Sequence, residues 1–128
     1  MSEGATQLLG TDRWPEVVTR FREAEIALPS DAFSAALTSV GRLAMMIADG
    51  PLSTVLFGWT SMFDLCIQQT DAPPCSGPYL KVSPLASGWV EFRYVDTAVV
   101  ARQWHRKVPP DAVTARFRAF LEQLHWIA

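Results

Sequence analysis

The stretch WVEFRYVDTAVVARQWHRK, residues 89–107, decides the fold because apolar and polar side chains alternate along it. Alternate residues of a β-strand point to opposite faces, so a strand with one buried face shows this pattern. Along residues 89–96, Val90, Phe92 and Tyr94 share one face, which we expect to lie against the core. The other face, which we expect to meet water or a partner, carries Trp89, Glu91, Arg93 and Val95.

The segments on either side are predicted to be strands of the same sheet. Residues 79–84 turn through residues 86–88 into residues 89–96, with Leu80 and Val82 pointing inward. The outward side chains of this strand are Tyr79, Lys81 and Ser83. Residues 99–108 are predicted to form a further strand, of which neither face is purely apolar. One face carries Val100, Arg102, Trp104, Arg106 and Val108, and the other carries Ala101, Gln103, His105 and Lys107.

Helices are predicted before and after these strands. The helical spacing of apolar residues indicates a first helix at 13–27 and a second that begins at Ser30 or Asp31. Gly50, followed by proline, ends the second helix and is expected in a left-handed cap. Two adjacent prolines and an aspartate at 109–111 open a final helix.

Two short β-like segments lie between the second helix and the loop at 71–78. Residues 54–57 and 62–68 show period-two patterns, and residues 58–61, GWTS, separate them. A tight hairpin is favoured here, and one bent strand with a bulge at Gly58 is the alternative.

Segregated helices and strands predict an α+β fold, with an N-terminal helical hairpin, an antiparallel sheet of four or five strands and a C-terminal helix. The helices are expected to pack on one face of the sheet. The length of 128 residues and a hydrophobic content of 49% fit a single domain, residues 1–128, with a substantial core. Residues 1–11 are expected to form a loosely ordered leader.

Composition and charge narrow the function classes. No apolar stretch approaches the roughly 20 residues of a membrane helix, and no signal peptide is recognisable, so we expect a cytoplasmic protein. In a reducing compartment, Cys66 and Cys75 are expected to be free thiols. The net charge of −2 argues against nucleic-acid binding. Residues 1–80 hold nine acids and four bases, a net of −5, whereas residues 81–128 hold four acids and seven bases, a net of +3.

No arrangement typical of catalysis, a metal or a cofactor is present in the sequence. The glycines have the wrong spacing for a phosphate loop, and the two cysteines and two histidines do not form a zinc pattern. Cys66 lies between Leu65 and Ile67, which indicates a buried, inert thiol. His105 is the best candidate for acid–base chemistry, and Cys66, His105 and Asp96 can be drawn as a set. Such sets occur in most proteins of this size, so we predict no enzyme, no metal and no cofactor.

Three other polar or aromatic residues invite structural interpretations. Asp64 interrupts an apolar strand, and a buried carboxylate there needs a partner such as Arg93 or Arg102. Trp59 is interpreted as a lid on the core in preference to an exposed anchor. His125 lies in the last helical turn, where a cation is favourable.

The outward side chains of the strands form the main candidate surface. The structural interpretation is cross-strand charge pairing, such as Glu91 opposite Lys81 or beside an arginine, worth about 0.2–1 kcal/mol without any function. The functional interpretation is a recognition patch, because Trp, Tyr and Arg dominate interface energetics. The candidate binding residues are Tyr79, Lys81, Trp89, Glu91, Arg93, Arg102, Trp104, His105 and Arg106.

These features favour a protein-interaction module, with a protein partner or self-association and with no nucleic acid or membrane. In size and layout the chain is similar to the small cytoplasmic immunity proteins with which bacteria neutralise toxins, a likeness of architecture that no motif carries. The alternative is a small-molecule or anion-binding domain with a pocket between helices and sheet. There Arg93 or Arg102 would hold the anion and Trp59 or Trp104 would stack on the ligand. A third hypothesis is a symmetric dimer through a strand edge or the aromatic face.

Overall fold

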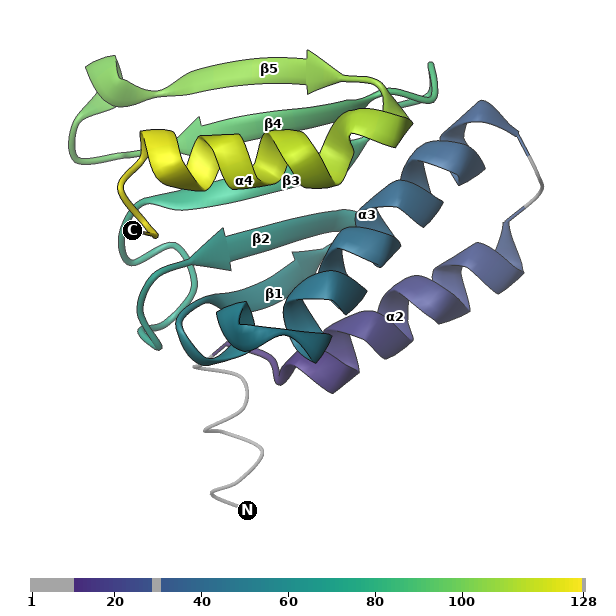
Figure 1. Cartoon of the computed structure of the whole chain (residues 1–128), viewed down its shortest axis with the longest axis horizontal. Helices are drawn as coiled ribbons and strands as arrows, with labels where there is room; N and C mark the ends of the chain where they lie inside the picture. The colour runs from purple at the N-terminus through teal and green to yellow at the C-terminus, as the bar shows by residue number, and fades with distance from the viewer. Residues whose placement is uncertain (1–10, 29–30, 128) are drawn as a thin grey trace.

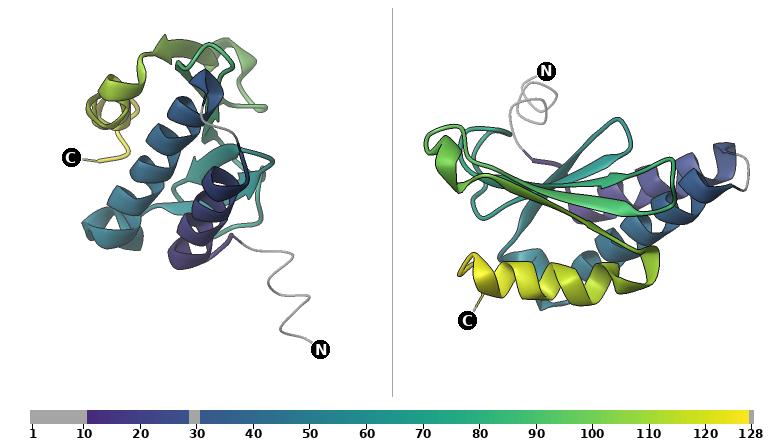
Figure 2. Two further views of the ribbon diagram at one scale, coloured as in Figure 1. Left: turned by 90° about the vertical axis from the view of Figure 1, so that its right-hand side faces the viewer. Right: turned by 90° about the horizontal axis from the view of Figure 1, so that it is seen from above.

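The computed structural model describes residues 11–28 and 31–127, and it confirms the α+β architecture. Helices α2 (Trp14–Ala27) and α3 (Ala32–Asp49) precede an antiparallel five-stranded sheet, and α4 (Val113–Gln123) follows it. α3 and α4 lie across the same side of the sheet, with α2 beside α3 (Figure 1, Figure 2). The strands, which lie side by side in chain order, are β1 (Phe57–Ser61), β2 (Asp64–Gln68), β3 (Tyr79–Pro84), β4 (Val90–Val95) and β5 (Trp104–Val108). Apart from Thr11, the predicted leader lies outside the described residues.

The N-terminal helices begin and end close to the predicted positions. α2 confirms the helix expected at 13–27. Asp31 caps α3, because its carboxylate accepts a hydrogen bond from the backbone N–H of Ser34 at 2.9 Å. The left-handed cap predicted for Gly50 is wrong, since its φ is −119°. The helix ends there because Pro51 starts a short 3-10 helix, η1 (Pro51–Thr54), and has no N–H for the α-helical pattern.

The first hairpin is formed by different residues from those predicted. The segment GWTS lies within β1, and of the strand predicted at 54–57 only Phe57 is in a strand, because Thr54 ends η1 and residues 55–56 connect the two elements. Ser61 pairs with Asp64, so the turn consists of Met62 and Phe63. Met62 adopts a φ of +58°, a conformation usually taken by glycine, while Phe63 packs edge-on against Phe33 with ring centroids 5.3 Å apart.

The core lies between the sheet and the helices. Val90 and Phe92 are fully buried and Tyr94 is buried, which confirms the predicted inward face of β4. Phe92 contacts Phe117 and Phe120 of α4, with ring centroids 6.5 and 5.0 Å away. Further fully buried side chains of this core are Leu37, Val40, Leu43, Ile47, Leu65, Ile67, Leu80, Val82 and Leu121.

Trp14 joins α2 to the first strand. Its indole Nε1 donates a hydrogen bond to the Leu56 carbonyl at 2.9 Å, and its ring lies directly over Gly58. The backbone N–H of Asp12 donates to the Gly58 carbonyl at 2.9 Å and forms a bridge on the outer edge of β1. Asp12, just before α2, is thereby held at one edge of the sheet.

The connection between β4 and β5 shortens the strand predicted at 99–108. A 3-10 helix, η2 (Val100–Arg102), occupies its first part, and β5 begins only at Trp104. Asp96, which is only 2% exposed, holds the bend. Its Oδ1 accepts from the N–H of Val99, and its own N–H donates to Oε1 of Gln103, both at 3.0 Å. After β5, another 3-10 helix, η3 (Pro110–Ala112), leads into α4.

Candidate functional site

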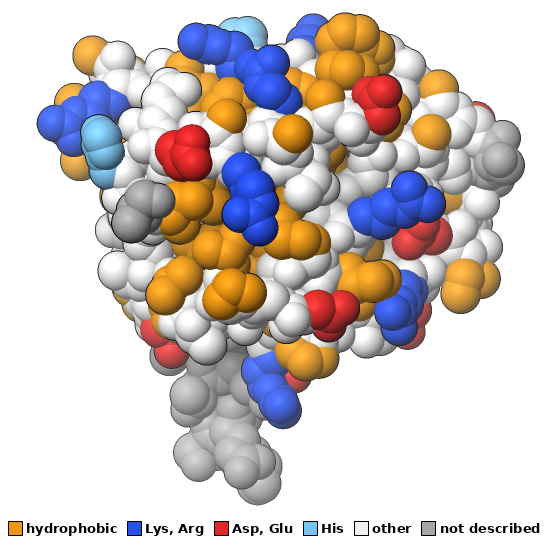
Figure 3. Space-filling model, in the orientation of Figure 1, with side chains coloured by type: hydrophobic (Ala, Val, Ile, Leu, Met, Phe, Trp, Pro, Cys, Tyr) orange, Lys and Arg blue, Asp and Glu red, His pale blue; other side chains and the backbone are white. Residues whose placement is uncertain are grey.

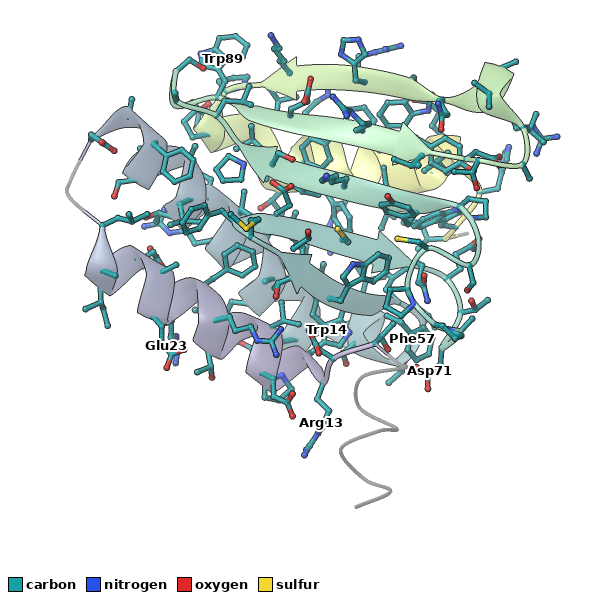
Figure 4. The ribbon with its side chains drawn as sticks, turned by 180° about the vertical axis from the view of Figure 1, so that it is seen from behind. Arg13, Trp14, Glu23, Phe57, Asp71 and Trp89 are labelled. Carbon is teal, nitrogen blue, oxygen red and sulfur yellow. The ribbon has the colours of Figure 1, made fainter. Side chains whose placement is uncertain are left out.

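The face of the sheet turned away from α3 and α4, here called the outer face, is toward the viewer in Figure 4, and the strand register places Tyr79, Lys81, Glu91, Arg93 and His105 on it. Lys81, Arg93 and His105 occupy directly opposed positions on β3, β4 and β5. Opposed residues of an antiparallel sheet share a face, so these basic side chains form one row across three strands. Glu91 lies in the next row, opposite Lys107 of β5.

A hollow of about 410 Å³ opens over this row, here called the outer-face hollow. Tyr94 and Trp104 are paired with each other, between the basic row and the level of Tyr79 on the sheet. Their rings contact α4 or the segment after it, on the helix side, so these two residues form part of the floor of the hollow. The residues that line the hollow are Tyr79, Lys81, Arg93, Tyr94, Val95, Gln103, Trp104 and His105. Five of them belong to the predicted binding set.

One carboxylate is shared by two basic groups of the hollow. Glu91 Oε1 lies 3.5 Å from Nη2 of Arg93, and Glu91 Oε2 lies 3.5 Å from Nδ1 of His105. Of the two pairings predicted for Glu91, the one with an arginine is present, whereas the one with Lys81 is wrong because the register places Ser83 opposite Glu91. Both contacts are long, and the side chains of Arg93 and His105 are 54% and 68% exposed. Exposed pairs of this kind contribute roughly 0–1 kcal/mol, so both groups remain available to an incoming anion.

Lys81 has a different partner. Its Nζ lies 3.4 Å from Oδ2 of Asp64, and the partners predicted for Asp64, Arg93 and Arg102, are wrong. Asp64 is partly exposed at the start of β2, so the pair is a surface ion pair and not a buried one. Lys81 therefore faces the outer-face hollow with its charge partly balanced.

Trp104 and Arg106 lie on the helix side of the sheet, which corrects their predicted place on the outer surface. Trp104 stands opposite Tyr94 and packs on Phe120 with ring centroids 4.9 Å apart. Arg106 stands opposite Phe92, and its guanidinium carbon lies 5.6 Å from the Trp104 ring centroid. The position is exposed because β5 is the last strand of the sheet.

Two more candidates lie at the margins of the surface. Arg102 belongs to η2, outside the strands, and is exposed. Trp89 directly precedes β4, is 47% exposed, and lies at the end of the sheet opposite to Phe57 and Asp71 (Figure 4). Neither residue lines the outer-face hollow.

Trp59 of β1 and Tyr79 of β3 form an aromatic pair that covers part of the outer face. Trp59 is buried, with its ring centroid 5.3 Å from that of Tyr79, but it stands on the outer face opposite Cys66. Trp59 is therefore buried as predicted and not an exposed anchor, and it covers the outer face of the sheet. Burial, followed by a hydrogen bond with Cys75, raises the pKa of Tyr79 to about 12. A tyrosine is protonated near neutral pH with or without this shift, so Tyr79 presents a neutral hydroxyl at the rim of the hollow.

Gln103 is one of three lining residues outside the predicted binding set, the others being Tyr94 and Val95. It follows η2 and precedes β5, and its amide oxygen already accepts the N–H of Asp96. That hydrogen bond fixes the side chain beside the hollow. The sequence around Gln103 does not predict this role, because the hydrogen bond of its side chain depends on the bend of the chain at Asp96.

The residues drawn as a catalytic set are not brought together. Cys66 on β2 and His105 on β5 are separated by two strands, which corresponds to roughly 14 Å. Burial raises the pKa of the Cys66 thiol to about 12, so it is not a nucleophile near neutral pH. Asp96 is buried and hydrogen-bonded to the backbone of Val99. Within residues 11–28 and 31–127, no group of three His, Cys, Asp or Glu side chains is placed to hold a metal ion.

Comparison with known proteins found no matching family model, no matching curated protein and no matching solved structure. None of the helices in the described part of the chain combines the length and apolar character needed to cross a bilayer.

Proposed function

We propose that this protein is a protein-interaction module, an immunity-like inhibitor or partner binder, that recognises an acidic region of another protein with its outer face. The observation that carries the proposal is the row of Lys81, Arg93 and His105 within one hollow. A carboxylate of the partner enters the outer-face hollow, where it takes the place of Glu91 as the anion between Arg93 and His105.

The chemistry of the hollow suits a carboxylate. The Arg93 guanidinium can bind a carboxylate through two parallel hydrogen bonds, which is stronger than its single 3.5 Å contact with Glu91. Tyr79 and Gln103 add neutral polar groups at the rim, and Val95 adds apolar surface. Trp89, exposed just before β4 at the margin of the surface, is an aromatic side chain of the kind that often anchors a protein interface.

The test measures binding to the product of the neighbouring gene by calorimetry. Arg93→Glu should weaken binding by at least about tenfold, because it reverses the central charge of the row. The matched control is Arg22→Glu, at an exposed position of α2 away from the sheet. Equal effects of the two substitutions, or no binding by the unsubstituted protein, would count against this function.

A second candidate function is the binding of a small organic anion by the hollow alone. Its volume falls in the range of small-molecule sites, about 300–1,000 Å³. The hollow lies on the outer face and not between helices and sheet, and the Trp104 ring in its floor packs on Phe120. Titration with succinate or inorganic phosphate separates the candidates. Saturable shifts of the Lys81, Arg93 and His105 resonances favour a small ligand, and their absence favours the protein partner.

A further inference from the structure

The β5 edge, meaning the outer side of residues 104–108, is an unpaired edge of the sheet. β5 pairs with β4, and no other described strand lies beside it (Figure 1, Figure 2). The opposite edge, at β1, differs because the N–H of Asp12 already bonds to the Gly58 carbonyl. An edge strand presents backbone N–H and C=O groups at every second residue, which makes it a template for another strand.

The Arg106 guanidinium already donates a hydrogen bond to one backbone carbonyl of this edge. Its Nη1 donates to the His105 carbonyl at 2.8 Å. Because this donor belongs to β5 itself and not to β4, the His105 carbonyl points toward the open edge. His105 is therefore one of the residues whose backbone can pair with a further strand. The side chains of His105 and Lys107 stand on the outer face, and that of Arg106 stands on the helix side. An added strand would therefore meet basic side chains on both faces.

The charge of the edge identifies the kind of strand that fits. Residues 99–108, VVARQWHRKV, contain no acid, and they contain Arg102, His105, Arg106 and Lys107. Basic side chains also gather along the top of the molecule in Figure 3, where Figure 1 places β5. Two copies paired through this edge would set like charges against each other, which destabilises a sheet. A strand that carries carboxylates has the complementary charge.

We propose that the β5 edge binds an acidic, extended segment of a protein partner by strand addition. The proposal rests on the function proposed above and specifies the partner's form. On binding, the segment's backbone pairs with the N–H and C=O of His105, and the Arg106 guanidinium leaves the His105 carbonyl for a carboxylate of the segment. His105 also lines the outer-face hollow, so an added strand and the hollow would form one continuous recognition surface.

The experiment uses a capped peptide of alternating threonine and glutamate, about eight residues long, as a probe for the segment. Amide resonances and hydrogen exchange of the full chain are followed by NMR during titration. The expected result is slower exchange at the His105 amide, by at least about tenfold, with shifts concentrated in β5 and β4. A threonine–lysine peptide should not bind. A threonine–glutamate peptide N-methylated at alternate residues should also fail, because it cannot complete the backbone hydrogen bonds.

Two substitutions keep the outcome interpretable. Arg106→Glu should weaken peptide binding by about tenfold, whereas Arg22→Glu should leave it unchanged. Circular dichroism checks that both variants are folded, and Arg106→Ala replaces Arg106→Glu if the reversal unfolds the chain. The N-methylated peptide tests the same proposal without any change to the protein.

The outcomes separate strand addition from the broader function. Peptide-induced shifts at Lys81 and Arg93, without slower exchange in residues 104–108, would overturn strand addition and leave the outer-face function standing. Slower exchange at His105 that survives Arg93→Glu would support strand addition while removing the hollow from the binding site. Equal binding of both charged peptides, peptide binding that leaves the whole sheet unchanged, absence of binding, or self-association through β5 in light scattering would overturn strand addition.

Discussion

Gly58→Ala should destabilise the protein because Trp14 occupies the space that a side chain would need. A Cβ at this position would lie 2.6 Å from Cη2 of Trp14 and 3.1 Å from both Cζ2 and Cζ3. Carbon atoms pack best at about 3.5–4.0 Å, so the ring must move by roughly 1 Å. The buried ring is held by the hydrogen bond from its Nε1 to Leu56, and movement would lengthen that bond.

The size of the effect follows from two opposing contributions. Overpacking of a buried site costs about 1–3 kcal/mol, and replacement of glycine by alanine returns about 0.4–1 kcal/mol through the entropy of the unfolded chain. With the hydrogen bond of Trp14 also strained, we expect a net loss of about 2 kcal/mol in the free energy of unfolding. In a domain of this size that loss lowers Tm by roughly 8 °C.

Urea denaturation followed by circular dichroism measures the loss. Gly77→Ala is the matched control, because nothing lies within 4 Å of its Cβ position, and it should change stability by less than about 0.5 kcal/mol. Trp14→Phe removes the far ring atoms that meet the new Cβ. Gly58→Ala should therefore cost about 1 kcal/mol less in that background than in the wild type. Equal stability of the two glycine variants would refute the reasoning.

Two other expectations concern a helix cap and a buried thiol. Asp31→Ala should cost about 1 kcal/mol because it removes the acceptor for the Ser34 N–H, while Asp31→Asn should retain most of the stability, as urea denaturation can measure. Burial raises the pKa of Cys66 from its ordinary value of 9.0 to about 12, so on a rise in pH the thiol loses its proton in the unfolded chain first. The free energy of unfolding should therefore fall as pH rises from about 9 toward 12. Cys66→Ala should make this slope shallower in denaturation curves recorded under reducing conditions, with Tyr79 contributing to the fall that remains above about pH 10, and an unchanged slope would contradict the assignment. Native thiol labelling should modify Cys75 and spare Cys66, as mass spectrometry would show.

The sequence predicted the inward faces of β3 and β4 because both strands alternate without interruption. Leu80, Val82, Val90 and Phe92 are fully buried, as period-two geometry requires. The sequence of β5 does not show which of its faces is buried. Its sequence WHRKV has one large apolar residue and three consecutive basic ones, so charge alone does not separate Arg106 from its neighbours. Pairing with the buried face of β4 decides the assignment, and pairing is a tertiary property.

The first hairpin shows a different limit of sequence reasoning. Gly58 and the hydroxyl residues of GWTS resemble a turn, but the glycine is needed for the approach of Trp14, a contact between residues far apart in the chain. The true turn contains Met62 at φ +58°, where a propensity argument expects glycine or asparagine. The outer-face hollow was only partly predictable for a similar reason, since Gln103 reaches it through its bond to Asp96.

The chain-ordered sheet has a consequence for the folding pathway. Every strand pairs with its neighbours in sequence, so each step of sheet assembly closes only a local loop and costs little entropy. α3 must pack across strands formed much later in the chain, and α4 must return to cover β4. We expect hairpins to form early and the docking of these two helices to limit the folding rate, so substitutions at Phe117 should slow folding more than substitutions in the β1–β2 turn.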